Sequence, residues 1–124
     1  MNTKKAVVCD DDRTLIRIIE HVLKKQGFSV WSASDGEQGL ALLRAQAPEL
    51  LILDLDMPVK GGMAVLEELK QQTSRPYTII LSNYEDPEQH QKAKTLGAKE
   101  FLVKPLDPVE FLKKIEGLVK EGRI

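Results

Sequence analysis

Short apolar runs alternate with longer segments of mixed polarity along the whole chain. Aliphatic, β-branched and aromatic residues dominate each run, and most runs stop at a polar or acidic residue. A buried strand of a parallel sheet has this pattern, whereas a helix needs a longer stretch. We therefore predict five strands, at Ala6–Cys9, Phe28–Trp31, Leu50–Leu53, Tyr77–Leu81 and Phe101–Val103.

The segments between the runs carry apolar side chains at helical spacing. The clearest stripe, at i, i+3, i+4, i+7 and i+8, consists of Leu15, Ile18, Ile19, Val22 and Leu23. An apolar stripe of this period predicts an amphipathic helix, and a following glycine is a typical stop. The predicted helices are Arg13–Gln26, Gly36–Gln46, a third opened by Gly61-Gly62, Pro87–Leu96, and a fifth that begins near Pro108. The fourth has only a weak apolar face, made mainly of Ala93 and Leu96.

Five strands that alternate with five helices through short loops predict a doubly wound α/β fold. Right-handed crossovers then give a parallel five-stranded sheet with helices on both faces. In such sheets the ligand site forms beyond the carboxyl ends of the strands, where the strand order reverses. The residues that follow each strand are therefore the ones in which to look for function.

Composition and charge narrow the classes of function. The 124 residues suit one domain spanning 1–124, and the net charge of -1 argues against direct binding to nucleic acid. The single cysteine, Cys9, cannot form an intrachain disulfide, and its place in an apolar strand predicts an inert buried thiol. We find no signal-peptide core and no run long enough for membrane insertion, so we predict a cytoplasmic protein.

Polar and charged residues follow four of the five predicted strands. They are Asp10, Asp11 and Asp12 after the first strand, Asp54 and Asp56 after the third, Ser82 after the fourth, and Lys104 after the fifth. Carboxylates gathered at one sheet edge repel one another unless a cation lies among them, and ligands that are all oxygen suit Mg²⁺. The sequence therefore predicts a magnesium site at this edge.

The same group of residues suits phosphoryl chemistry. A metal ion and Lys104 would neutralise charge on a phosphoryl group, and the hydroxyl of Ser82 would donate a hydrogen bond to it. A carboxylate can itself accept the phosphoryl group as an aspartyl phosphate. Asp54 follows the most apolar strand, which we expect at the centre of the sheet, so it is the best-placed nucleophile.

Some of these residues also have ordinary structural explanations. Asp12 is expected to cap the first helix rather than bind metal. His21 and His90 lie on predicted helices without partners at metal-ligand spacing, so we expect them on helix faces. Phe101 is first of all an aromatic residue of the core or of the sheet edge.

Four groups of residues match one family in order and position. They are Asp10-Asp11, Leu53-Asp54-Leu55-Asp56-Met57-Pro58 with Gly62 following, Ser82, and Lys104-Pro105. Together they resemble the receiver domain of bacterial two-component response regulators, of the type found in chemotaxis. The resemblance covers nearly the whole chain and implies a flavodoxin-like arrangement. It also implies a signalling domain that catalyses its own phosphorylation and dephosphorylation, not an enzyme acting on a separate substrate.

The resemblance assigns a role to each matching residue. Asp54 takes the place of the phosphoacceptor and Lys104 that of the lysine that contacts the phosphoryl group. Asp11 would bind Mg²⁺ directly, Asp10 through water, and Asp56 through its backbone carbonyl. Ser82 and Phe101 take the places of the switch hydroxyl and the switch aromatic, and Pro105 follows a peptide bond that is commonly cis in the family. Asn83, where the family usually has a small residue, is expected to narrow access to Asp54, and Asp12 replaces a frequent glutamate.

The resemblance further implies partners and an output. The phosphoryl donor would be a histidine kinase or a phosphotransfer protein, and the signal would pass to a downstream output protein or to a fused output domain. Phosphorylation would draw Ser82 inward and let an outward Phe101 become buried, which would change the surface formed by the fourth helix, fifth strand and fifth helix. Tyr84 is expected to cover the acyl phosphate and slow its hydrolysis.

Three alternatives stay open at this point. Asp54-Leu55-Asp56 also resembles the first motif of haloacid-dehalogenase-type phosphatases, although that family places its other motifs in a different order. An adaptor that resembles a receiver but is never phosphorylated is a second alternative. The third concerns the extent of the protein, which is either a stand-alone receiver or part of a longer regulator.

Overall fold

The computed structural model describes residues 3–72, 75–83 and 86–124. Its strands are β1 (Lys4–Cys9), β2 (Phe28–Ala33), β3 (Leu50–Asp54), β4 (Tyr77–Ser82) and β5 (Glu100–Val103). Its helices are α1 (Arg13–Lys25), α2 (Gly36–Gln46), α3 (Gly62–Leu69), α4 (Pro87–Thr95) and α5 (Pro108–Lys120). Strands and helices alternate as predicted from the apolar runs.

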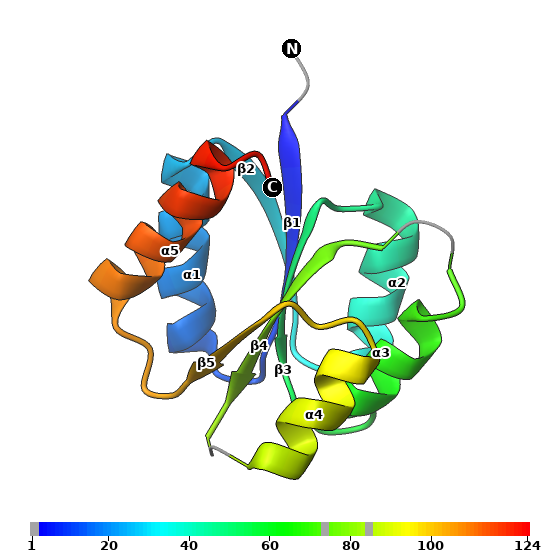
Figure 1. Ribbon diagram of the computed structural model, residues 1–124. Helices are drawn as coiled ribbons and strands as arrows, with labels where there is room; N and C mark the ends of the chain where they lie inside the picture. The colour runs from blue at the N-terminus through cyan, green and yellow to red at the C-terminus, as the bar shows by residue number, and fades with distance from the viewer. Residues whose placement is uncertain (1–2, 73–74, 84–85) are drawn as a thin grey trace.

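All five strands pair in parallel, in the order β2-β1-β3-β4-β5. Helices α1 and α5 cover one face of this sheet, and α2, α3 and α4 cover the other (Figure 1). The predicted doubly wound α/β fold is therefore confirmed, with β3 at the centre. The strand order reverses between β1 and β3, so the expected ligand site lies at the carboxyl ends of these two strands.

The sheet alternates its side chains between two apolar layers. Within β3, Leu50 and Ile52 belong to the layer under α1 and α5, whereas Leu51 and Leu53 belong to the layer under the other three helices. All four are fully buried. A strand buried on both faces has no room for polar residues, which explains the uninterrupted apolar run in the sequence.

Several element boundaries differ slightly from the sequence predictions. Asp54 and Ser82 are the last residues of β3 and β4, rather than the first residues beyond them. Helix α2 ends at Gln46 as predicted, and the next residue, Ala47, has a left-handed conformation (φ 46°) that ends the helix. Asp12 caps α1 as expected, since its carboxylate accepts hydrogen bonds from the N–H groups of Thr14 and Leu15.

Among the described residues, no helix is long and apolar enough to cross a membrane. Cys9 is fully buried in β1, and burial first of all raises the pKa of its thiol to about 12. A thiol that stays protonated and shielded is unreactive, as the sequence predicts.

Candidate functional site

Two buried carboxylates lie at the point where the strand order reverses. Asp10, just beyond β1, has no exposed surface, and Asp54, at the end of β3, is 1% exposed. Each uses one oxygen in the same way: Oδ1 of Asp10 accepts from the N–H of Asp12 (2.8 Å), and Oδ1 of Asp54 accepts from the N–H of Asp56 (3.1 Å). These backbone hydrogen bonds fix both carboxylates at the edge of the sheet.

Lys104 joins the two carboxylates through their remaining oxygens. Its Nζ lies 2.9 Å from Oδ2 of Asp10 and 3.3 Å from Oδ2 of Asp54. The N–H of Lys104 donates to the carbonyl of Ser82 (2.8 Å), which places the lysine at the ends of β4 and β5. The peptide bond between Lys104 and Pro105 is cis, as the resemblance implies.

The charges in this cluster shift the pKa values of its members. Burial raises the pKa of Asp54, and the nearby carboxylate of Asp10 adds to the rise, while the Asp56 N–H and Lys104 oppose it. Burial would lower the pKa of Lys104, but its hydrogen bond and ion pair with Asp10, together with Asp54, raise it. The fold thus keeps the ammonium charged and disfavours the negative charge on Asp54.

Asp11 completes a group of three carboxylates. Oxygens of Asp10, Asp11 and Asp54 all lie within 4.8 Å of one another, with Asp11 exposed and the other two buried. One ammonium group faces these three carboxylates, so negative charge is in excess. A set of hard oxygen donors with excess negative charge, open to solvent on the side of Asp11, fits Mg²⁺. The side chain of Asp56 is exposed and lies outside this group, which leaves its backbone carbonyl as the expected ligand.

Ser82 and Phe101 lie on the same face of the sheet. Ser82 is 2% exposed, and the β4–β5 register sets Ile80 opposite Phe101 and Ser82 opposite Val103. Phe101 is partly buried and stacks on the ring of His90. The ring that was expected to point outward is thus partly covered by α4.

A shallow hollow opens beside Lys104. It has a volume of about 440 Å³ and is lined by Asp12, Thr14, Leu15, Ile18, Asn83, Lys104, Pro105 and Leu106. Asn83 lines this hollow, but Asp54 does not, so the expectation that Asn83 narrows access to Asp54 stays a prediction. Tyr84, expected to cover the phosphoryl group, lies outside the described residues.

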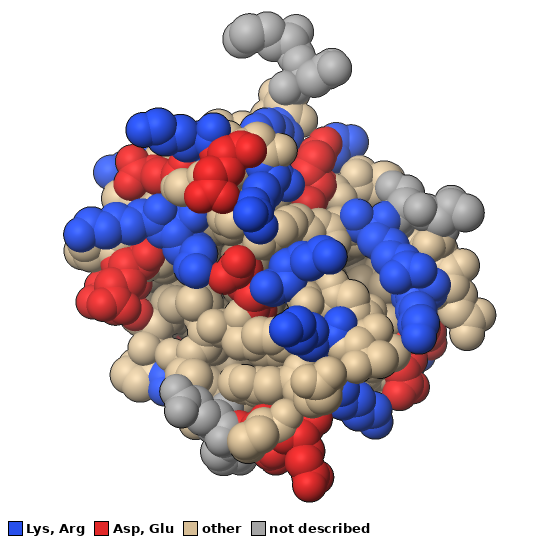
Figure 2. Space-filling model, viewed as in Figure 1, with Lys and Arg blue, Asp and Glu red and all other residues tan. Residues whose placement is uncertain are grey.

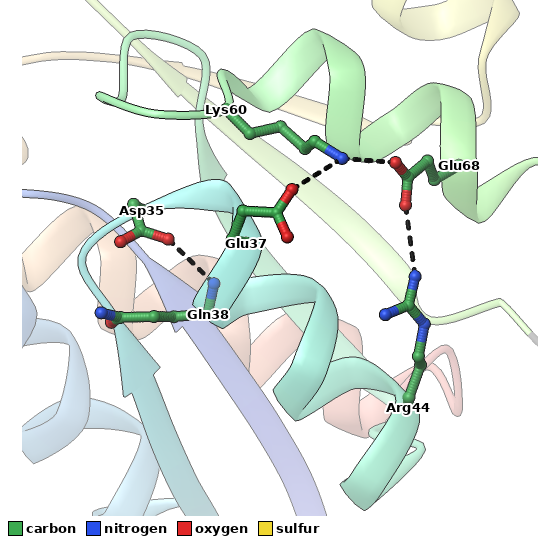
Figure 3. A network of polar contacts seen from close by, with 6 residues as sticks. All are labelled: Asp35, Glu37, Gln38, Arg44, Lys60 and Glu68. Carbon is green, nitrogen blue, oxygen red and sulfur yellow. Dashed lines mark hydrogen bonds and ion pairs between the residues drawn. The ribbon is translucent and has the colours of Figure 1, made fainter.

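The loop between β3 and α3 is fixed by a network of ion pairs. Lys60 lies between Glu37 of α2 (2.9 Å) and Glu68 of α3, and Glu68 also pairs with Arg44 of α2 (3.3 Å), as Figure 3 shows. Hydrogen bonds to Glu68 and Glu37 raise the pKa of Lys60. The network connects both helices to the loop that carries Asp56.

Close backbone contacts hold the same loop. A Cβ on Gly62 would lie 2.4 Å from the carbonyl oxygen of Asp54, and a Cβ on Gly36 would lie 2.2 Å from that of Lys60. No side chain fits at either position without moving backbone. The glycine that follows the Asp54 motif is therefore needed to let α3 begin directly against the end of β3.

Comparison with known proteins identifies the family. A family model described as response regulator receiver domain matches residues 6–116. The chain belongs to this family. Among curated relatives, the transcriptional regulatory protein CpxR of Klebsiella pneumoniae is 34% identical over 118 residues, covering 95% of this chain and 50% of the relative. The alkaline phosphatase synthesis transcriptional regulatory protein PhoP of Bacillus subtilis is 27% identical over 121 residues, covering 98% and 50%.

Solved receiver domains have the same fold. The chemotaxis protein CheY4 of Vibrio cholerae is 28% identical with a TM-score of 0.85, covering 94% of this chain and 98% of that one. The receiver domain of the Francisella response regulator 1452 is 26% identical with a TM-score of 0.83, covering 98% and 99%. This chain spans about half the length of the curated relatives it matches. Membership of the receiver family also removes the phosphatase alternative.

This receiver domain brings together most of the site residues predicted from its sequence. Asp10, Asp11, Asp54 and Lys104 form one cluster, and Ser82 ends the strand next to Asp54. Sequence reasoning missed the role of Lys60, whose partner Glu37 is 23 residues away and belongs to another helix. It also placed His90 on a helix face without metal-ligand partners, and nothing in the sequence pairs its ring with that of Phe101.

Proposed function

We propose that this receiver domain accepts a phosphoryl group on Asp54 in the presence of Mg²⁺. The observation that carries the proposal is the pair of contacts that Lys104 makes with Asp10 and Asp54 where the strand order reverses. One cation, one central carboxylate and two further carboxylates meet there. Because the negative charge is not balanced within the protein, this arrangement suits a metal cation, and the cation together with Lys104 could then receive an anionic phosphoryl group.

The proposed chemistry uses Asp54 as the nucleophile. An Asp54 oxygen forms a bond to phosphorus while the bond from phosphorus to the donor breaks, and the donor keeps that electron pair. With a phosphohistidine donor, the departing imidazole nitrogen takes a proton from solvent. The hydrogen bond from Asp56 N–H to Oδ1 holds the carboxylate in a fixed orientation, which lowers the entropic cost of the attack.

Lys104 and Ser82 would stabilise the transferred group. The ammonium of Lys104 is already within hydrogen-bond reach of Asp54, so it can pair with a phosphoryl oxygen bound there. Ser82 ends the neighbouring strand, and its hydroxyl would donate to a second oxygen. Asp10 and Asp11, with the carbonyl of Asp56, would hold Mg²⁺, which supplies charge neutralisation on the phosphoryl oxygens.

We also propose the partners predicted from the sequence. The donor is a histidine kinase or a phosphotransfer protein, and the output is carried by another protein or by a domain fused to residues 1–124. Two relatives named as transcriptional regulators, each about twice as long as the matched region, support this proposal. The cytoplasmic location stays a prediction from the sequence.

The surface that changes on phosphorylation is proposed to comprise α4, β5 and α5. Figure 2 shows this face, where residues other than Lys, Arg, Asp and Glu cover much of the lower half and basic and acidic side chains lie interspersed above them. Val103 and Val109 are 38% and 59% exposed at β5 and at the start of α5. Exposed apolar side chains on a face that α4 can reshape suit a binding site for another protein.

Labelling with a small phosphodonor tests the proposal. Acetyl phosphate and Mg²⁺ should label the parent protein, whereas chelation of the metal or the Asp54→Asn substitution should abolish labelling. Asp56→Asn is the matched control, since its exposed carboxylate is not proposed to react, and it should keep most of the label. Equal labelling of Asp54→Asn and the parent contradicts the proposal. An unlabelled parent favours the adaptor that is never phosphorylated.

A further inference from the structure

Helix α4 is held to the rest of the domain by few contacts. Ala93 is its only fully buried residue. The ion pair between Lys92 and Glu67 of α3 spans 3.8 Å, and both side chains are more than half exposed. Exposed pairs of this kind add little stability. Any further contact between α4 and the sheet therefore has a large share in setting the position of the helix.

One such contact is the ring stack between His90 and Phe101. The two ring centroids are 4.6 Å apart and the ring planes differ by 20°. Within the part of the chain that the structure describes, Nε2 of His90 is shielded from solvent and has no hydrogen-bond partner. The imidazole is thus placed by packing on Phe101, without a hydrogen bond at this nitrogen.

The stack connects α4 to the phosphoryl site through β5. Phe101 lies opposite Ile80, and Val103 lies opposite Ser82, so Phe101 and Ser82 face the same side of the sheet one diagonal step apart. Leu81, between Ile80 and Ser82, pairs with Asp54. A movement of Ser82 can therefore reach His90 through one intervening side chain, that of Phe101.

We propose that His90 is a positioning residue that holds Phe101 in its partly buried place and so opposes the phosphorylated conformation. The proposal rests on the function proposed above and on the movement expected from the sequence, in which Phe101 turns inward as Ser82 moves toward the phosphoryl group. The inward ring leaves His90, and the stack is lost. A contact present in only one of two conformations shifts the equilibrium toward that conformation. The residue at position 90 thereby sets how readily the receiver switches.

Titration with beryllofluoride, which mimics a phosphoryl group on a carboxylate, tests the proposal. In saturating Mg²⁺ we expect His90→Ala to bind beryllofluoride about two- to tenfold more tightly than the parent, the range that an aromatic pair provides. His90→Phe keeps a ring against Phe101 and should stay close to the parent. The affinity for Mg²⁺ alone should be equal in all three proteins, since the metal contacts neither ring.

A double substitution separates this coupling from a general loosening of the fold. In a Phe101→Ala background the stack is already gone, so adding His90→Ala should leave beryllofluoride affinity unchanged. Circular dichroism confirms that each variant is folded at the temperature used.

Three results would overturn the inference. The first is a His90→Ala protein that binds beryllofluoride no more tightly than the parent. The second is a gain in affinity from His90→Ala that is as large in the Phe101→Ala background as in the parent. Either result leaves the proposed function intact. A parent protein that binds no beryllofluoride in Mg²⁺ overturns the proposed function and this inference together.

Discussion

The ammonium group of Lys104 lies 3.3 Å from the carboxylate of Asp54, although their strands β5 and β3 are not neighbours. The lysine reaches across the end of β4 to make this contact. A phosphoryl group on Asp54 would therefore meet a cation that is already in place. The same contact stabilises the ionised form of Asp54, which burial disfavours.

Removing the charge of Asp54 should stabilise the metal-free protein. Burial raises the pKa of this carboxyl, which means that the fold disfavours its ionised form. Asp54→Asn keeps an oxygen for the Asp56 N–H and leaves Lys104 paired with Asp10. We expect the melting temperature at neutral pH to rise by roughly 3–8 °C. Asp56→Asn, at an exposed position, should change it little; a melting temperature of Asp54→Asn at or below that of the parent contradicts this reading.

Magnesium should stabilise the domain through Asp11. Mg²⁺ relieves the repulsion among three carboxylates, so it should raise the melting temperature of the parent, and Asp11→Ala should remove most of that rise. Asp12→Ala is the control. This substitution removes the cap of α1, at a cost of about 1 kcal/mol, but leaves every proposed metal ligand in place. The Asp12→Ala protein should melt at a lower temperature than the parent without Mg²⁺, and added Mg²⁺ should raise its melting temperature as much as that of the parent. The site is wrongly assigned if Asp11→Ala responds as strongly as Asp12→Ala.

The ion pair at the start of β5 should give an acid-dependent contribution to stability. Burial would raise the pKa of Glu100, but hydrogen bonds from Lys114 and Tyr77 outweigh it and hold the pKa below its ordinary value. A carboxyl whose pKa is lowered by folding contributes stability above its unfolded pKa and loses it as the pH falls through the folded value.

Chemical denaturation of Glu100→Gln measures this contribution. The variant should be less stable than the parent at pH 7, by less than about 1 kcal/mol, and the difference should shrink as the pH falls below about 4.5. Glu116→Gln, an exposed carboxyl on α5, should show no such dependence. A difference that stays constant down to pH 3 would show that the lost packing, and not the ion pair, was measured.

Two glycines should respond to alanine in opposite ways. A Cβ at Gly62 would press on the carbonyl of Asp54, so Gly62→Ala should destabilise the domain by about 1–3 kcal/mol. A Cβ at Gly117 in α5 meets no atom within 4 Å, so Gly117→Ala should stabilise it by about 0.5–1 kcal/mol. Urea denaturation, which gives the free energy of unfolding, checks the direction of both predicted changes. A free energy of unfolding that is the same for Gly62→Ala and the parent would mean that α3 can shift away from Asp54 without loss of stability.

The sequence allowed the fold and the central cluster to be predicted for a physical reason. Strand positions follow from apolar runs, and a parallel sheet brings all carboxyl ends to one edge, so Asp10, Asp54 and Lys104 meet without any local signal between them. The match of four residue groups to a known family then assigned their roles.

Contacts between helices could not be predicted in the same way. Lys60 pairs with Glu37 and Glu68 because α2 and α3 pack beside each other, and the sequence does not contain that geometry. Likewise, His90 stacks on Phe101 only because α4 lies across that part of β5. The partial burial of Phe101 could not be predicted for the same reason.

Chemical trapping of the acyl phosphate tests the central claim most directly. Borohydride reduces an aspartyl phosphate to homoserine, which mass spectrometry of the digested protein locates to a single residue. After treatment with acetyl phosphate and Mg²⁺, we predict homoserine at position 54 and none at Asp10, Asp11 or Asp56. Homoserine at one of those three positions, or at no position in a protein that has gained a phosphoryl group, would contradict the assignment of Asp54 as the phosphoacceptor.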